Sequence, residues 1–219
     1  MWNPFARLAP EEAAWQAPQR IHVDHASAED LFRRQVGFFL RRFYSTTRAL
    51  AVLCIGTDRS TGDCLGPLIG SKLSAGLPER VRVLGTLDRP VHAVNLAESM
   101  DDLRAWEPDA FVIAIDACLG RTESVGYISL KEGPLQPGTG VNKSLPAVGD
   151  FHIIGIVNVG GFMEYLVLQN TRLSLVMRMA EIIARGLHDE IWSMMGGVPA
   201  AAMAPAYAAA ETAAAQPRC

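Results

Sequence analysis

The sequence lacks the motifs that define several common functional classes. Only four cysteines occur in 219 residues and none forms a CxxC pair, which argues against a disulfide scaffold and favours reduced thiols. No HExxH motif is present, so a zinc peptidase of that type has no support. GxxxxGK[ST] and GxGxxG are also missing, which leaves nucleotide binding unsupported. We therefore expect no cofactor.

Strong charge of one sign and long apolar runs are missing as well. The formal net charge is −3, too small to draw nucleic acid or an anionic membrane to the whole surface. No stretch of about 18 uncharged apolar residues occurs, and the N-terminus has neither the basic nor the apolar region of a signal peptide. We expect a cytoplasmic protein that binds neither nucleic acid nor membrane. The pattern does not indicate an oligomeric state.

The composition divides the chain into three parts. Residues 1–48 are predicted to form an N-terminal arm and an amphipathic helix, whose apolar face includes Phe32 and Val36. Residues 49–193 are predicted to form one α/β domain, and residues 194–219, which are mostly Ala and Pro, a disordered tail. A further hypothesis is that the arm covers the functional site until it is removed.

Short apolar runs alternate with helical segments in the central part. This βαβαβ alternation predicts a mainly parallel sheet with helices on both faces, because the crossover connections of parallel strands cover the sheet in that way. A single long helix is predicted from about Gly161 to Trp192. The predicted strands cover residues 50–55, 81–84, 110–115, 125–130 and 153–157.

Two aspartates follow predicted strands. Asp63 lies in the loop after the first strand, and Asp116 is the first residue beyond the third. Because the carboxyl ends of parallel strands meet at one edge of a sheet, we expect both to line a shared crevice. Two carboxyl groups with separated pKa values can activate water, one as base and the other as acid. Two simpler roles stay open: Asp63 caps the following helix, and Asp116 only orders its turn.

Other candidate residues have a simpler interpretation. Cys64 and Cys118 each lie within two residues of an aspartate, yet free cysteine is usually a small core residue. His92 and His152 have no metal-ligand spacing around them and are interpreted as solvated or hydrogen-bonded. Residues 135–144 form a Gly-rich loop with one cation, Lys143, which favours a lid or a substrate-binding loop.

Five ordered stretches resemble the YyaC family of sporulation proteins, which is related to germination protease. The similarity extends over about residues 50–187 and is more specific than any isolated motif. The stretches are IGTDRSTGDCLGP (55–67), GTLDRPVHAVN (85–95), AIDACLG (114–120), PGTGVNK (137–143) and GIVNVGGFMEYLVLQNTR (155–172).

The resemblance implies a fold and two site residues. Germination protease is similar in fold to hydrogenase-maturation endopeptidases, which implies a phosphorylase/hydrolase-like three-layer α/β fold with a mixed, mainly parallel sheet. Its two acidic site residues correspond to Asp63 in Asp-x-Leu-Gly-Pro and Asp116 in Ile-Asp-Ala. The metal-binding histidine of the hydrogenase peptidases has no counterpart in the later loop before His152, so no metal is expected.

We therefore predict a sporulation-associated endopeptidase of the developing spore or mother cell. Its partner would be a protein or peptide substrate, such as a small spore protein or another sporulation protein. Asp63 and Asp116 are the expected catalytic residues. The expected substrate-binding residues are Asp58, Asn142, Lys143 and Asn158. The alternative is a non-catalytic sporulation factor that uses this fold to bind a protein partner, through the pocket or through the helix that carries Arg33, Arg34, Arg41 and Arg42.

Overall fold

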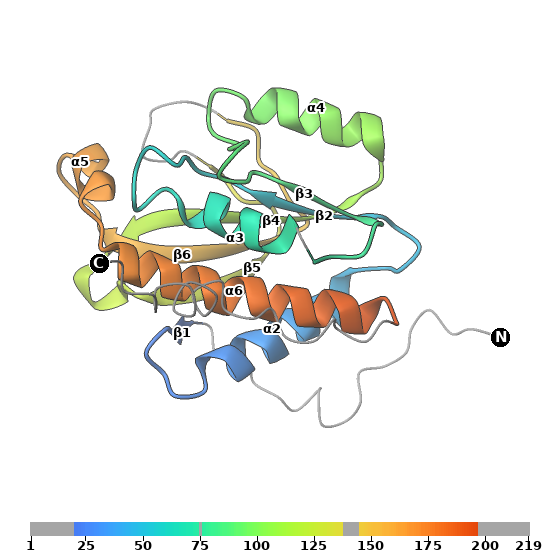
Figure 1. Ribbon diagram of the computed structural model, residues 1–219, viewed down its shortest axis with the longest axis horizontal. Coiled ribbons are helices and arrows are strands. Elements are labelled where there is room, and N and C mark those ends of the chain that lie inside the picture. Colours follow the sequence, from blue (N-terminus) through green and yellow to red (C-terminus); the bar gives the residue numbers. More distant parts are fainter. Residues whose placement is uncertain (1–19, 75, 138–144, 197–219) are drawn as a thin grey trace, which may run out of the picture.

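One six-stranded sheet forms the centre of the computed structural model, which describes residues 20–74, 76–137 and 145–196. The strand order is β1-β5-β6-β4-β2-β3 (Figure 1). The four strands β2, β3, β4 and β6 are parallel, β5 is antiparallel to β6, and β1 is antiparallel to β5. Their bounds are β1 Ile21–His22, β2 Leu50–Cys54, β3 Val81–Leu84, β4 Phe111–Gly120, β5 Tyr127–Glu132 and β6 Phe151–Val159. The expected mixed, mainly parallel sheet is confirmed.

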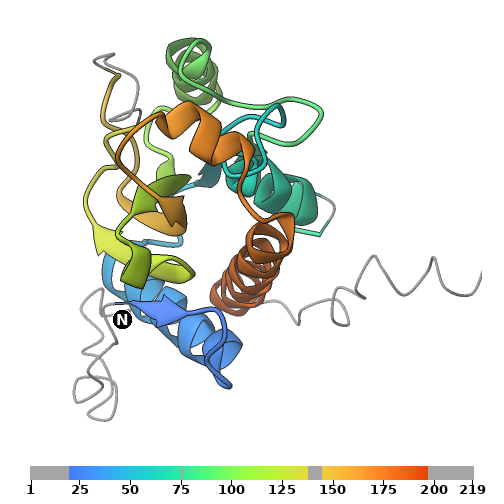
Figure 2. The ribbon, with the colours of Figure 1, turned by 90° about the vertical axis from the view of Figure 1, so that its left-hand side faces the viewer.

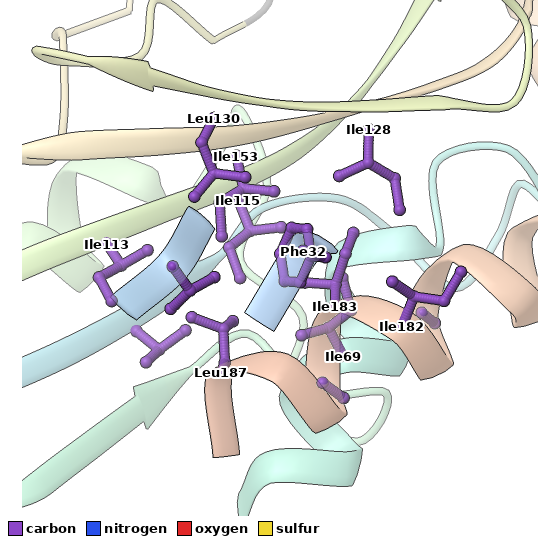
Figure 3. Close-up of a cluster of buried hydrophobic side chains, with 14 of the residues drawn as sticks. Phe32, Ile69, Ile113, Ile115, Ile128, Leu130, Ile153, Ile182, Ile183 and Leu187 are labelled. Carbon is purple, nitrogen blue, oxygen red and sulfur yellow. The ribbon is translucent and has the colours of Figure 1, made fainter. Parts of the chain in front are cut away.

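Three helices cover one face of the sheet: α2 (Ala28–Phe43), α3 (Leu65–Ser74) and α6 (Leu173–Met194). Figure 3 shows Phe32 of α2 among isoleucines of the strands and of α6. Phe32 is fully buried, and a Cβ added at Gly186 of α6 would lie 2.5 Å from its ring. Gly186 therefore lets α2 approach α6 closely, and the amphipathic helix belongs to the main core. The division at residues 48 and 49 stays a prediction.

The opposite face is covered by α4 (Leu96–Trp106), whose Leu96 and Leu103 pack on Ala51 and Leu53 of β2. The strand β2 is buried along its whole length because helices cover both faces, which explains its continuous apolar run. A short 3-10 helix, η1 (Thr122–Ser124), links β4 to β5. No described helix is long and apolar enough to cross a membrane.

The single helix predicted from about Gly161 to Trp192 is wrong. The structure has α5 (Glu164–Gln169) and then α6, with a break at Asn170 and Thr171. Side chains satisfy carbonyls at the break: Thr171 Oγ1 donates to Val167 O at 3.0 Å, and Asn170 Nδ2 donates to Leu166 O at 2.8 Å. Such side-chain bonds compete with continued helix, so α5 ends after six residues. Figure 2 shows α5 lying across the edge of the sheet at the end of β6.

A candidate aspartate-pair active site

Asp116 lies where β4 continues beyond its neighbour β2. The last residue of β2, Cys54, pairs with Ile115, whereas Asp116 pairs only on the other side, with Ile154 of β6. Side chains alternate along a strand, and Ala114 and Ile154 belong to the cluster on the α4 face, so the half-buried Asp116 points to that face. Its Oδ1 accepts a hydrogen bond from Ala117 N at 2.8 Å. The space beside Asp116 is thus left to the loop that follows β2.

Asp63 is half-buried in that loop, two residues before α3 begins at Leu65. Its carbonyl accepts a hydrogen bond from Thr57 N at 3.1 Å, and the Thr57 N–H also acts to lower the pKa of the Asp63 carboxyl group. The start of the loop is thus tied to Asp63, and the role of Asp63 as a helix cap stays open. The loop doubles back at Gly56, which has φ +142 and lies so close that an added Cβ would be 2.0 Å from Asp63 O. Only glycine fits there.

The two carboxyl groups interact electrostatically although they are 53 positions apart in the sequence. Burial raises the pKa of Asp116 well above its usual range, the negative charge of Asp63 raises it further, and the Ala117 N–H opposes the shift. Burial also raises the pKa of Asp63, while the Thr57 N–H and His92 oppose that shift. The environments therefore favour a proton on Asp116, with Asp63 as the ionised partner.

His92 is the neighbour of Asp63 that the sequence analysis did not assign to the site. It follows Val91, whose carbonyl accepts a hydrogen bond from Gly56 N at 2.8 Å, so the segment between β3 and α4 is joined to the loop after β2. Its Nδ1 accepts from Val94 N at 3.3 Å, which places the proton of the neutral ring on Nε2. The hydrogen-bonded interpretation of His92 is correct. Its place in the segment that follows β3 was the available signal for a position beside Asp63.

The two cysteines near the aspartates are both reduced. Burial and the charge of Asp63 raise the pKa of Cys64, and burial and the charge of Asp116 raise the pKa of Cys118 to about 11. Both thiols are therefore protonated at neutral pH and are poor nucleophiles or metal ligands. Within residues 20–74, 76–137 and 145–196, no group of three or more His, Cys, Asp and Glu side chains is arranged to hold a metal ion.

The remaining predicted residues lie in different places. Asp58 is exposed in the same loop as Asp63, and its charge contributes to the raised pKa of Cys64. Asn158 on β6 donates from Nδ2 to Val167 O and Thr171 Oγ1, both at 3.2 Å, so it holds α5 onto the sheet. His152 is buried and its Nδ1 is 2.8 Å from Gly133 O, as the hydrogen-bonded interpretation predicts.

The ends of the Gly-rich loop are paired. Leu135 and Val148 exchange two backbone hydrogen bonds, at 2.7 and 2.9 Å, and both side chains are buried. Their side chains belong to the cluster on the α4 face, which is also the face of Asp116. Asn142 and Lys143 lie outside the described residues, so their predicted roles stay predictions.

These features define a class: a three-layer α/β protein with two interacting aspartates at the carboxyl ends of its central parallel strands. The chain belongs to the family described as "Protein of unknown function (DUF1256)", whose model matches residues 20–186. It is 54% identical over 166 residues to "Uncharacterized protein YyaC" of Bacillus subtilis (strain 168), which covers 76% of this chain and 80% of that protein. The expected resemblance to YyaC is confirmed.

A comparison with solved structures finds a NiFe hydrogenase maturation protease, HycI, from Thermococcus kodakarensis KOD1. The two chains are 18% identical, and the TM-score is 0.46. The match covers 68% of this chain and 98% of that chain.

Proposed function

We propose that this protein is an endopeptidase in which Asp63 and Asp116 activate a water molecule. One observation carries the proposal: the carboxyl group of Asp116 on β4 interacts with that of Asp63 in the loop after β2, and the pKa of Asp116 is well above its usual range. Carboxyl pairs whose environments favour different protonation states are typical of acid–base catalysis. The sporulation substrate, a small spore protein or another sporulation protein, is proposed from the resemblance to germination protease.

The proposed roles follow from the surroundings of each carboxyl group. The ionised Asp63, near His92, takes a proton from water, and the resulting hydroxide attacks the peptide carbonyl carbon. The protonated Asp116 gives its proton to the departing amine nitrogen when the C–N bond breaks. Backbone amides of the Gly-rich loop, or Lys143, are the proposed donors to the developing oxyanion.

Contacts of the arginine-bearing helix do not favour the alternative function as a partner-binding surface. Arg33 Nη1 donates to Glu190 Oε1 at 3.1 Å, and Arg41 Nη1 lies 3.7 Å from Glu190 Oε2. The Glu190 side chain is 8% exposed, so the two arginines neutralise a buried carboxylate of α6. Arg42 stacks over the Phe43 ring at 5.2 Å. These three side chains therefore have structural contacts within the fold.

The test uses purified full-length protein and a small spore protein, with fragments identified by mass spectrometry. We expect Asp63→Asn and Asp116→Asn each to lower the cleavage rate by about 100-fold or more, because each removes a proton-transfer group. Asp101→Asn is the control, since Asp101 forms an exposed ion pair with Arg104 on α4. Circular dichroism checks that the variants fold. Equal fragment yields from all three variants would refute the catalytic roles.

A further inference from the structure

Large apolar side chains are exposed around α5. Phe162 is 88% exposed, Tyr165 69% and Met163 55%. Contiguous exposed apolar surface on a folded protein usually marks a place where something binds. We call this region the α5 patch and define it by Val159, Phe162, Met163, Tyr165, Leu166 and Leu173.

The α5 patch contains a preformed hollow. A wide-open hollow of about 560 Å³ is lined by Phe162, Met163 and Leu166, together with Asn158 and Asn170. It has room for a side chain of a peptide. The two bonds from Asn158 to Val167 and Thr171 hold α5, which carries part of the lining, against β6.

The hollow contains neither aspartate, but it is directly joined to both stretches that carry them. Gly62, the residue before Asp63, donates from its backbone N to Leu168 O at 2.8 Å. Gly160 donates to Gly120 O, at the end of the strand that carries Asp116, at 2.7 Å. Packing at Gly62 is tight, since an added Cβ would lie 2.8 Å from the Leu168 side chain. The α5 patch therefore lies at the same end of the sheet as the two stretches that carry the aspartates.

We propose that the α5 patch binds an apolar side chain of the peptide substrate next to the cleaved bond. This inference rests on the proposed peptidase function and adds the substrate class, an extended peptide with an apolar residue. The size of the patch favours a peptide over a second folded copy. Six side chains around one short helix are far fewer than the about 20–30 residues a side of a stable protein interface. Extended peptides present alternate side chains to pockets of this kind.

The test measures binding without catalysis, in full-length protein that carries Asp63→Asn. The probe is a nine-residue Gly/Ser peptide with one central benzoyl-phenylalanine, which is crosslinked by light and mapped by mass spectrometry. We expect the label on residues 159–173. Phe162→Ser should reduce labelling about tenfold, because one apolar contact of that size is lost. The control is Trp106→Ser, since Trp106 is 37% exposed and ends α4 at the opposite edge of the sheet.

Three results would overturn the inference. The first is a crosslink outside residues 159–173, or a crosslinking yield at these residues that is the same in Phe162→Ser. The second is a dimer in sedimentation analysis that Phe162→Ser dissociates, which would assign the α5 patch to a second copy. The third is stronger labelling when Trp2 and Phe5 are both changed to Ser. That result would mean that the N-terminal arm competes with the probe, and it would assign the α5 patch to the arm. If the probe labels residues 159–173 as expected but the unmodified protein cleaves no substrate, only the proposed function is refuted. If the protein cleaves peptides with and without an apolar residue at the same rate, only this inference is refuted.

Discussion

Gly56 gives the sharpest test of how the loop after β2 positions Asp63. In the variant Gly56→Ala, the new Cβ would lie 2.0 Å from Asp63 O, where Cβ atoms essentially never come closer than 3.0 Å to a neighbour. The Asp63 backbone must therefore move by about 1 Å, and a misplacement of that size can lower the rate about 100-fold. The positive φ of +142 adds backbone strain of about 1–3 kcal/mol, and the overlap adds about 1–3 kcal/mol more.

A matched variant separates the two costs. Gly161 has φ +143, nearly the same as Gly56, but an added Cβ meets nothing within 4 Å. The free energy of unfolding of Gly161→Ala should therefore fall only by the cost of the backbone strain. Gly56→Ala should be less stable than Gly161→Ala by about another 1–3 kcal/mol, because it also has the overlap. Urea denaturation measures the free energy of unfolding, and cleavage of a small spore protein measures the rate. Equal stability of the two variants, together with an unchanged cleavage rate for Gly56→Ala, would show that the close approach to Asp63 is not required.

Two further predictions concern Asp116 and the core. The pKa of Asp116 is raised in the folded protein, so the stability from its bound proton is fully present below the unfolded pKa of about 3.9 and is lost as pH rises through the raised value. The free energy of unfolding of Asp116→Asn, measured by urea denaturation, should thus rise relative to that of the unmodified protein as the pH is raised above about 4. A constant difference between the two proteins across this pH range would contradict the prediction. Phe32→Ala should cost about 3–5 kcal/mol in the same assay, because Phe32 is fully buried, and a cost under about 1 kcal/mol would show that α2 is not part of the core.

Local patterns predict much of the sheet and the placement of the aspartates. The strands β2, β3 and β4 follow from short apolar runs, because each of these runs is bounded by polar or glycine-containing segments. The rule that ligands bind at the carboxyl ends of parallel strands places Asp63 and Asp116 together, and the structure brings them within electrostatic reach. Their catalytic roles, and the substrate-binding role of Asp58, stay predictions.

The features that the sequence did not reveal depend on contacts between distant segments. Local side-chain bonds of Asn170 and Thr171 form the break before α6, and Asn158 of β6 then holds α5 on the sheet through Val167 and Thr171, a contact that no helical pattern encodes. The strand β1 has only two residues and exists through pairing with β5. The place of His92 depends on the bond between Gly56 and Val91, which joins the loop after β2 to the segment after β3.

The backbone pair formed by Leu135 and Val148 has a consequence for how this family can diversify. Because these residues bond to each other and bury their side chains, the sheet does not depend on the length of the chain between them. Doubling the length of a flexible loop costs only about 0.6 kcal/mol. Residues can therefore be added or removed between Leu135 and Val148 at little thermodynamic cost, while the apolar cluster on the face of Asp116 stays the same.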